Sequence, residues 1–260
     1  MNRIAIIRGQ GKDELGNVQK DVARLIKGYG LSPVITEKEE DIKSCDMIIS
    51  LGGDGSILSL ARRMSYLDIP VLGINLGQTG FLTELELTHI EKLEDILSGN
   101  YILDERMMLE AETSDGTKIV ALNDICIKSS RMVITNIFVD TMMAYKYNGD
   151  GVVVSTATGS TAYSRNVGGP VAQPNMELFI INPVAPTKRF SDSLLIPSHH
   201  DILINTLGTK TKEDVKLIID GQESMDIQTT DNIFIKKAPN SLKLVRRNDT
   251  SFYKRLIDKL

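Results

Sequence analysis

A single carboxylate among glycines, Asp54, is the first group in this sequence that could do chemistry. The apolar run Met47–Leu51 before it predicts a strand buried on both faces, and apolar residues at helical spacing over 57–61 predict a helix after it. Glycines in such a strand-to-helix turn let backbone N–H groups approach a ligand, and a helix N-terminus favours anions, above all phosphate. The residues expected to bind this phosphate are Gly52, Gly53 and Gly55.

The Asp54 carboxylate would repel a phosphate held by these amides unless it had a task of its own. It could accept a proton from an attacking hydroxyl group, or it could organise a Mg²⁺ ion. The alternative is a tight turn in which Asp54 caps the helix that follows. The four residues of the turn do not decide between these interpretations.

A second polar stretch, residues 148–163, combines glycines, a carboxylate and a run of hydroxyl groups. Asp150 lies between two glycines where a strand begins, and the strand leads into the hydroxyl groups that precede Tyr163. Small hydroxyl residues beside glycine suit hydrogen bonds to a polar ligand, and the tyrosine ring could stack on a flat base. The alternative interpretation is a loop that is simply rich in serine and threonine.

Two further polar groups, Asn123 and Asp124, stand side by side in an apolar, strand-like setting. Neighbouring strand residues point to opposite faces, so both side chains can serve one site only near a bend or a strand end. The alternative is a polar pair on an edge strand. Residues 220–222, Asp-Gly-Gln, are a weaker signal that a plain turn explains equally well.

The first hundred residues alternate strand-like and helix-like patterns, which predicts α/β layering around a parallel sheet. Ligands in such sheets bind beyond the carboxyl ends of the strands, where both glycine-rich turns, residues 52–55 and 76–82, are expected. Acidic residues 37–41 are expected to form a solvated loop. The predicted strands are residues 4–7, 32–36, 47–51 and 70–75, and the predicted helices cover 18–26, 57–64 and 90–97.

Strand-like runs dominate after about residue 100, which predicts a second, mostly antiparallel β domain. We expect domains over residues 1–99 and 100–260, with a final helix over 251–260. The predicted strands are residues 107–113, 118–129, 133–146, 152–156, 178–181, 194–196, 202–205, 215–219, 232–236 and 242–245. We interpret the basic residues near the C-terminus as a solvated helix face, and they are Lys243, Arg246, Arg247, Lys254, Arg255 and Lys259.

The composition excludes several classes of protein. The chain has 260 residues, 42% hydrophobic and 25% charged, with a net charge of −4, so no broad basic surface for nucleic acid is expected. No apolar run approaches the roughly 20 residues that span a bilayer, and no signal peptide is recognised. The two cysteines lack a CxxC partner, which indicates a reducing, cytoplasmic setting and no cysteine metal site.

Seven short motifs, taken in order and at their spacing, resemble NAD kinases of the bacterial or archaeal type from about residue 4 to residue 260. The Gly-Gly-Asp-Gly turn alone is shared with lipid kinases, but its combination with Asn-Asp and Thr-Gly-Ser-Thr-Ala-Tyr is highly specific. The motifs lie at residues 52–55, 77–82, 123–124, 149–151, 158–163, 168–170 and 220–222.

This resemblance implies an α/β N-terminal domain, a β-rich C-terminal domain and a last segment, roughly residues 240–260, that packs back on the first domain. It implies transfer of the γ-phosphoryl group of ATP to the 2′-hydroxyl of the adenosine ribose of NAD, with Mg²⁺ or another divalent cation. It also implies a homodimer or homotetramer. The first domain would present phosphate and base, and the second would hold NAD.

The resemblance also assigns roles to single residues. Asp54 matches the proton acceptor, with Gly55 as its neighbour, and Phe81 matches an aromatic residue beside the adenine. The residues that match NAD contacts in the β-rich domain are Asn123, Asp124, Asn148, Asp150, Thr158, Thr161, Ala162, Tyr163, Ser164, Asn166 and Gln222. Asn148 occupies a variable position of the family, and the metal ligands are not assigned.

Two other functions remain open at this point. A lipid kinase with the same turn would need an apolar pocket or a basic membrane face, against which the net acidity and the polar 158–163 segment argue. A dinucleotide-binding sensor would keep Tyr163 and Asn123 but would have no need of Asp54.

Overall fold

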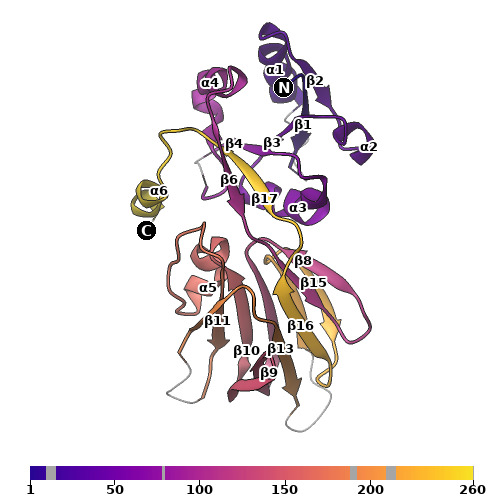
Figure 1. The fold of residues 1–260 in the computed structure, drawn as a ribbon, viewed down its shortest axis with the longest axis vertical. Coiled ribbons are helices and arrows are strands. Elements are labelled where there is room, and N and C mark those ends of the chain that lie inside the picture. Colours follow the sequence, from indigo (N-terminus) through magenta and orange to yellow (C-terminus); the bar gives the residue numbers. More distant parts are fainter. Residues whose placement is uncertain (10–15, 78–79, 188–191, 209–214, 260) are drawn as a thin grey trace. The chain divides into compact units, whose positions relative to one another are not determined.

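The computed structural model of the chain describes residues 1–9, 16–77, 80–187, 192–208 and 215–259. Its backbone separates into two compact units, residues 1–106 with 241–260 and residues 107–240 (Figure 1). The first unit combines helices with a mainly parallel sheet and the second is mostly antiparallel β, so the predicted fold class is confirmed. None of the described helices is long and apolar enough to cross a membrane. Residues 78–79 of the second predicted turn and Leu260 lie outside the described residues.

The sheet of the first unit has the strand order β2-β1-β3-β4-β17-β6, with the short β5 paired to β4. Neighbouring strands run parallel except β6, which is antiparallel to β17. The strands are β1 (Arg3–Arg8), β2 (Ser32–Ile35), β3 (Met47–Leu51), β4 (Val71–Asn75), β5 (Leu85–Glu86), β6 (Ile102–Arg106) and β17 (Leu242–Arg246). The α-helices are α1 (Gly16–Gly28), α2 (Glu39–Ile42), α3 (Asp54–Met64), α4 (Leu93–Leu97) and α6 (Phe252–Lys259), and the 3₁₀ helices are η2 (Ser65–Leu67) and η3 (Leu87–Lys92).

Helices cover both faces of this sheet, and its central strands β3 and β4 are consequently buried at every position. Leu72 and Ile74 of β4 belong to a buried cluster that includes side chains of α1 and α4. The residue between them, Gly73, must point to the other face, where a Cβ would lie 3.1 Å from Ile57 of α3. Continuous apolar strands such as β3 are therefore buried from both sides, as their sequence predicts.

The glycine turn of Asp54 lies at the point where the strand order reverses. Strand β1 has β2 on one side and β3 on the other, so successive connections leave the sheet in opposite directions. The carboxyl ends of β1 and β3 meet there, with the N–H of Gly9 donating to the carbonyl of Leu51 at 2.8 Å. Open α/β sheets bind their ligands at such a switch point.

The structure differs from the sequence-based expectations in the first unit at several places. Residues 39–42 form the helix α2 rather than part of a loop, because the side chain of Ile42 is fully buried and anchors the turn. Strand β6 was not predicted, and it pairs with β17 from the far end of the chain. The division between the units consequently follows residue 106, whereas the sequence placed a boundary near residue 99. In the sheet, β17, drawn in yellow in Figure 1, lies between β4 and β6.

The second unit is an antiparallel sheet with the strand order β12-β11-β10-β9-β13-β16-β7-β8, in which β14 pairs with β9 and β15. Its strands are β7 (Leu109–Glu112), β8 (Lys118–Ala121), β9 (Asp124–Val139), β10 (Met142–Thr156), β11 (Leu178–Val184), β12 (Leu194–Pro197), β13 (Ile202–Leu207), β14 (Val215–Ile219), β15 (Glu223–Ile227) and β16 (Asn232–Lys237). A 3₁₀ helix, η4 (Thr158–Thr161), and a short helix, α5 (Tyr163–Asn166), follow β10.

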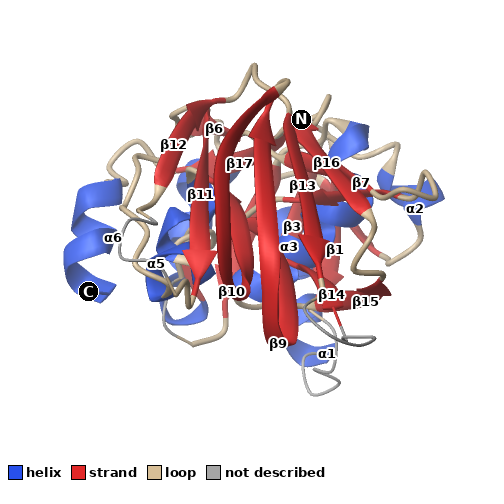
Figure 2. Cartoon of the chain, turned by 90° about the horizontal axis from the view of Figure 1, so that it is seen from below, coloured by secondary structure: helices blue, strands red, loops and turns tan. Residues whose placement is uncertain are grey.

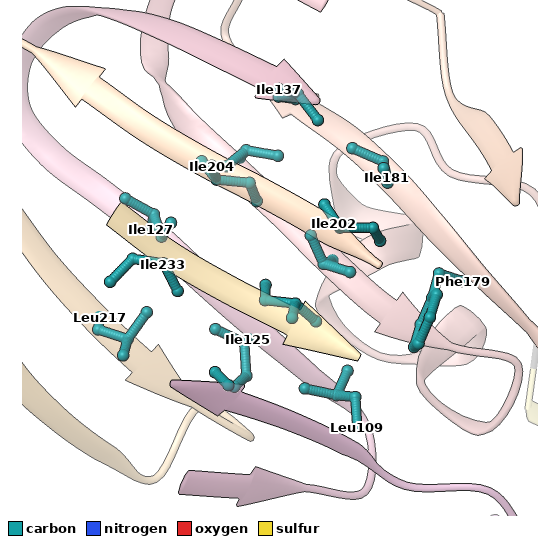
Figure 3. Close-up of a cluster of buried hydrophobic side chains, with 14 of the residues drawn as sticks. Leu109, Ile125, Ile127, Ile137, Phe179, Ile181, Ile202, Ile204, Leu217 and Ile233 are labelled. Carbon is teal, nitrogen blue, oxygen red and sulfur yellow. The ribbon is translucent and has the colours of Figure 1, made fainter. Parts of the chain in front are cut away.

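Two long strands, β9 and β10, form the centre of this unit as one hairpin (Figure 2). The sequence predicted interruptions over 130–132 and 147–151, but both strands continue through them. The register shifts between Gly149 and Gly151, so a β-bulge absorbs the glycines inside β10. Strand β15, which follows the tight turn at Asp220 and Gly221, was also not predicted. Figure 3 shows the buried side chains that β9 contributes to the core, among them Ile125, Ile127 and Ile137.

The central strands of the first unit generate a test of its stability. Ile49 of β3 is fully buried, so Ile49→Ala should lower the free energy of unfolding by about 2–5 kcal/mol through lost burial and a cavity. Ile35 on edge strand β2 is 49% exposed, and Ile35→Ala should cost under about 1 kcal/mol. Urea denaturation followed by circular dichroism compares the two variants, and equal losses would contradict this assignment of the core.

Candidate functional site

The Asp54 side chain contacts a second turn of the first unit. Asp54 is the first residue of α3, and its N-cap, Gly53, makes no side-chain capping bond. The Asp54 carboxylate accepts hydrogen bonds from the backbone N–H groups of Phe81 at 2.8 Å, Leu82 at 3.0 Å and Thr83 at 3.2 Å. Asp54 therefore does not act as a helix cap, and the capping alternative is wrong. Its carboxylate joins the turn after β3 to the segment after β4.

The close approach of these two turns requires a glycine at position 80. A Cβ built on Gly80 would overlap the Asp54 carboxylate. The Gly80 N–H donates instead to the hydroxyl of Thr83 at 2.8 Å, which closes a compact turn around the carboxylate. Gly80 of the second motif thus permits the close contact with Asp54.

Two arginines from the C-terminal segment bind the opposite side of residues 80–84. Arg246, at the end of β17, donates to the carbonyls of Phe81 and Leu82, each at 3.0 Å. Arg255, on α6, donates to the carbonyl of Gly80 at 3.1 Å and to that of Thr83. The sequence interpretation of these arginines as a solvated helix face is wrong, because Arg246 lies in a strand and is 4% exposed.

Acidic partners balance the charge of these arginines. The Glu84 carboxylate, itself buried, accepts from Arg246 at 3.2 Å and from Arg255 at 2.5 Å. Asp104 binds both Arg106 and Arg246. Burial lowers the pKa of Arg106 and of Arg255, since water no longer stabilises their charge. Burial raises the pKa of Asp104, but the hydrogen bond and charge of Arg106, together with Arg246, outweigh it and lower the pKa overall.

A carboxylate also organises the polar residues of the second unit. Asp220, in a left-handed backbone conformation with φ of 49°, accepts from the backbone N–H groups of Leu122 at 3.2 Å, Asn123 at 2.7 Å and Asp124 at 3.2 Å. The weak 220–222 motif is therefore more than a plain turn, because Asp220 holds the backbone of the Asn-Asp pair. Gln222 is exposed two residues further on.

The hydroxyl-rich segment packs against the same Asn-Asp pair. Thr156 donates through its hydroxyl to the carbonyl of Leu122 at 2.6 Å and through its N–H to the carbonyl of Asn123 at 2.9 Å. A Cβ on Gly159 would overlap the backbone of Asn123, so this glycine permits the contact. Asn123 lies in the bend before β9 and Asp124 begins that strand, which is the arrangement that lets both side chains serve one site.

Asp124 is the most perturbed acid of this group. Its side chain is nearly buried, and burial first, then the negative charge of Asp220, raise its pKa from 3.8 to about 7. A hydrogen bond from the backbone N–H of Tyr163 opposes this rise. The contact also brings Tyr163, at the start of α5, next to Asp124.

The other predicted residues of the 158–166 segment lie along η4 and α5. Ser164 is fully buried, and its hydroxyl accepts from the side-chain amide of Asn182 at 2.7 Å. Asn182 on β11 in turn accepts from the hydroxyl of Ser193 at 2.5 Å. Sequence reasoning missed Asn182 because it stands alone in an apolar strand. The remaining predicted residues here are Thr158 and Thr161 in η4, Ala162 between the helices, and Asn166 at the end of α5.

Two predicted residues of the second unit do not join this group. Asn148 is exposed on β10, and Asp150 follows it beside the bulge. Ser155 of β10 pairs with Asp124, and it lies five residues from Asp150, about 17 Å at roughly 3.3 Å per strand residue. Within the described part of one chain, Asn148 and Asp150 are therefore remote from Asn123 and Asp124.

Comparisons with known proteins agree over the whole chain. Family models for the ATP-NAD kinase N-terminal and C-terminal domains match residues 14–101 and 122–247. The NAD kinase of Lachnoclostridium phytofermentans is 34% identical, over 97% of this chain and 96% of that protein. The NAD kinase of Thermoanaerobacter sp. (strain X514) is 35% identical, over 100% of this chain and 99% of that protein.

Two solved structures share the fold. The crystal structure of an NAD kinase from Archaeoglobus fulgidus in complex with ATP has a TM-score of 0.80 and 25% identity, covering 99% of this chain and 96% of that chain. Yeast NADH kinase complexed with NADH has a TM-score of 0.81 and 22% identity, covering 98% and 86%. The second likeness concerns the fold alone.

The raised pKa of Asp124 generates a prediction about stability and pH. Between about pH 4 and pH 7 the folded chain retains a proton that the unfolded chain has released, so its stability falls as pH rises through this window. The loss from this one group is of the order of 1 kcal/mol per pH unit. Asp124→Asn mimics the protonated acid and should remove this part of the pH dependence.

Urea denaturation of both proteins at about pH 5 and about pH 8 measures the effect. The wild-type chain should lose stability relative to Asp124→Asn at the higher pH. Asp226→Asn, at an exposed position on β15, is the matched control and should follow the wild type. Parallel pH curves for wild type and Asp124→Asn would contradict a raised pKa at Asp124.

Proposed function

The chain belongs to the ATP-NAD kinase family, and we propose that it transfers the γ-phosphoryl group of ATP to the 2′-hydroxyl of the adenosine ribose of NAD, with Asp54 as the proton acceptor. Family membership makes the chain an ATP-dependent kinase that converts NAD to NADP. The observation that supports the assignment of Asp54 is the set of three backbone N–H groups that orient its carboxylate.

The two oxygens of Asp54 differ in the hydrogen bonds that they accept. Among the described residues, Oδ1 accepts from the N–H groups of Leu82 and Thr83, whereas Oδ2 accepts only from Phe81. A carboxylate oxygen has two lone pairs, so Oδ2 retains one for the proton of a substrate hydroxyl. Since phosphoryl transfer has a loose transition state, the base removes this proton late, and positioning and charge neutralisation supply most of the acceleration.

The backbone around Asp54 suits the phosphates of ATP. Helix α3 begins at Asp54 and runs to Met64, and its N-terminal N–H groups follow directly after Gly52 and Gly53 at the switch point of the sheet. Such a terminus attracts anions through its orphan N–H groups and its dipole. We assign phosphate binding to Gly52, Gly53 and Gly55 on this ground.

We assign NAD binding to the second unit, with Phe81 of the first unit beside the adenine. The joined contacts of Asn123, Asp124 and Tyr163 support this assignment for the adenosine end. Above about pH 7 an ionised Asp124 can accept hydrogen bonds from hydroxyl or amino groups of a ligand. The other residues assigned to NAD are Thr158, Thr161, Ala162, Ser164, Asn166 and Gln222, with Asn148 and Asp150 toward the nicotinamide.

A divalent cation, Mg²⁺ or a similar ion, is part of the proposal. No three described residues of the types His, Cys, Asp or Glu come together as a metal site. This suits Mg²⁺, which kinases hold through one or two carboxylates together with the substrate phosphates. The cation would neutralise phosphate charge, and its ligands in the protein are not assigned.

We propose a homodimer or homotetramer in the cytoplasm, acting on NAD and ATP and binding neither nucleic acid nor membrane. The distance along β10 between Asp150 and the Asp124 partner Ser155 supports a site to which a second chain contributes. The free, buried Cys45 and Cys126 are in keeping with a reducing compartment.

A coupled assay of NADP formation from NAD, ATP and Mg²⁺ tests the function. A dehydrogenase specific for NADP reports a phosphate at the 2′ position of the adenosine ribose. The control acceptor is 2′-deoxy-NAD, an analogue that lacks the 2′-hydroxyl of this ribose. We expect turnover of NAD and none of 2′-deoxy-NAD. Transfer of labelled phosphate to diacylglycerol in place of NAD would support a lipid kinase, and NAD binding without turnover would support a sensor.

Asp54→Asn tests the proton acceptor. The variant should lower kcat by about 10²-fold or more while NAD affinity changes little, because the amide cannot accept the hydroxyl proton. The side-chain NH₂ group of the asparagine would also face the backbone N–H of Phe81, from which it cannot accept a hydrogen bond. The free energy of unfolding should therefore fall by about 1–3 kcal/mol.

Asp46→Asn separates these two effects. The Asp46 carboxylate accepts from the backbone N–H groups of Asn2 at 2.5 Å and Arg3 at 3.0 Å, and it lies before β3, at the opposite end of that strand from Asp54. We expect a loss of stability in Asp46→Asn with kcat unchanged. A kcat near the wild-type value in folded, NAD-binding Asp54→Asn would refute the role of Asp54.

A further inference from the structure

Three consecutive peptide groups of the first unit are held from both ends by charged side chains. The peptide between Gly80 and Phe81 accepts from Arg255 at its carbonyl and donates to Asp54 at its N–H. The next peptide accepts from Arg246 at the Phe81 carbonyl and donates to Asp54 at the Leu82 N–H. The third accepts from Arg246 at the Leu82 carbonyl and donates to Asp54 at the Thr83 N–H.

This arrangement follows from the geometry of the peptide bond. In a trans peptide the C=O and N–H groups point in opposite directions, so a cation at one end and an anion at the other face each other across the peptide. Each of the three dipoles is aligned between a guanidinium group and the Asp54 carboxylate. Hydrogen bonds in series polarise one another, which strengthens the hydrogen bonds that these three N–H groups donate to Asp54.

The arginine side of the arrangement is buried and bound to a shared carboxylate. The Arg246 side chain is 4% exposed and that of Arg255 is 13% exposed, and both bind Glu84, whose side chain is 2% exposed. The backbone N–H of Arg247 and the hydroxyl of Thr250 also donate to Glu84. The N–H of Glu84 donates to the carbonyl of Gly73 at 2.8 Å, which ties the end of the segment to β4.

We propose that Arg246 and Arg255 are positioning residues for phosphoryl transfer, which hold the peptide groups of residues 80–83 so that these keep the Asp54 carboxylate aimed at the substrate hydroxyl. The inference rests on the proposed function of Asp54. It gives the C-terminal strand and helix a part in catalysis without contact with substrate. A misplacement of about 1 Å at such a carboxylate can cost up to about 10²-fold in rate.

Arg255 is the better residue to change, because Arg246 lies inside the sheet. Arg255→Met keeps an unbranched apolar stem but removes the guanidinium group with its charge and all its hydrogen bonds. Arg255→Lys keeps the charge and loses the planar fork that reaches two carbonyls and a carboxylate together. Lys254→Met removes a positive charge from an exposed position of the same helix and is the matched control.

Steady-state kinetics should separate positioning from binding. We expect kcat to fall by about 10-fold in Arg255→Met, with the KM for NAD within about threefold of the wild type, and Arg255→Lys to recover part of the loss. Lys254→Met should match the wild type. A kcat for Arg255→Met within twofold of the wild type would overturn the proposal, as would equal losses in Lys254→Met.

Hydrogen exchange supplies a readout that does not depend on activity. The N–H groups of residues 81–83 should exchange faster in Arg255→Met, while those of the distant strand β2 keep their wild-type protection. If Arg255→Met does not fold, the same comparison is made on Arg255→Lys, and unchanged exchange at 81–83 overturns the proposal. A wild-type chain that makes no NADP, yet shows this exchange pattern in the variant, would refute the proposed function and leave the positioning contact in place.

Discussion

The hydrogen bonds between the Asp54 carboxylate and the N–H groups of residues 81–83 are the interaction on which the proposed chemistry of the first unit depends. They are possible because β3 and β4 are neighbouring parallel strands, so the turns that follow them meet at the same edge of the sheet. Glycine at position 80 permits the close approach, and Arg246 and Arg255 bind the opposite side of the segment. The carboxylate is thereby oriented while one lone pair of Oδ2 stays available.

The second unit contains a similar carboxylate that binds three consecutive backbone N–H groups. Asp220 accepts from three consecutive N–H groups, those of residues 122–124, as Asp54 does from residues 81–83. Asp220 is buried, however, and lies beside Asp124, whose pKa is raised by burial first and then by the charge of Asp220, whereas Asp54 is partly exposed. Asp220 thus holds the backbone of residues 122–124, and Asp54 is itself held by the backbone of residues 81–83.

Sequence patterns within short segments were sufficient to predict the buried sheet and the turn of Asp54. The apolar run of β3, the glycines after it and the alternation of strand and helix predicted the buried sheet and the turn of Asp54. The motifs predicted the Asn123–Asp124 pair and the segment before Tyr163, which the structure brings together. The hairpin of β9 and β10 was predicted in pieces, because glycines that usually end strands are absorbed by a bulge.

Contacts between distant residues could not be predicted in this way. Arg246 binds a carbonyl 165 residues away, and it follows directly after the predicted strand 242–245, in a run that mixes basic and apolar residues. Nothing in that pattern distinguishes a buried guanidinium group from an exposed one. Glu84 and Asn182 were missed for the same reason, since the sequence around a polar residue does not show which distant groups it will bind.

The central claim is that Arg255 acts on catalysis through Asp54, and a double-mutant cycle of kcat tests it most directly. Asp54→Asn, Arg255→Met and the double variant are compared with the wild type under saturating NAD and ATP. Residues that act as one unit are not additive, so the double variant should be about as slow as Asp54→Asn alone. If the two losses multiply instead, the arginine acts independently of the carboxylate, and the account of the peptide groups between them is wrong.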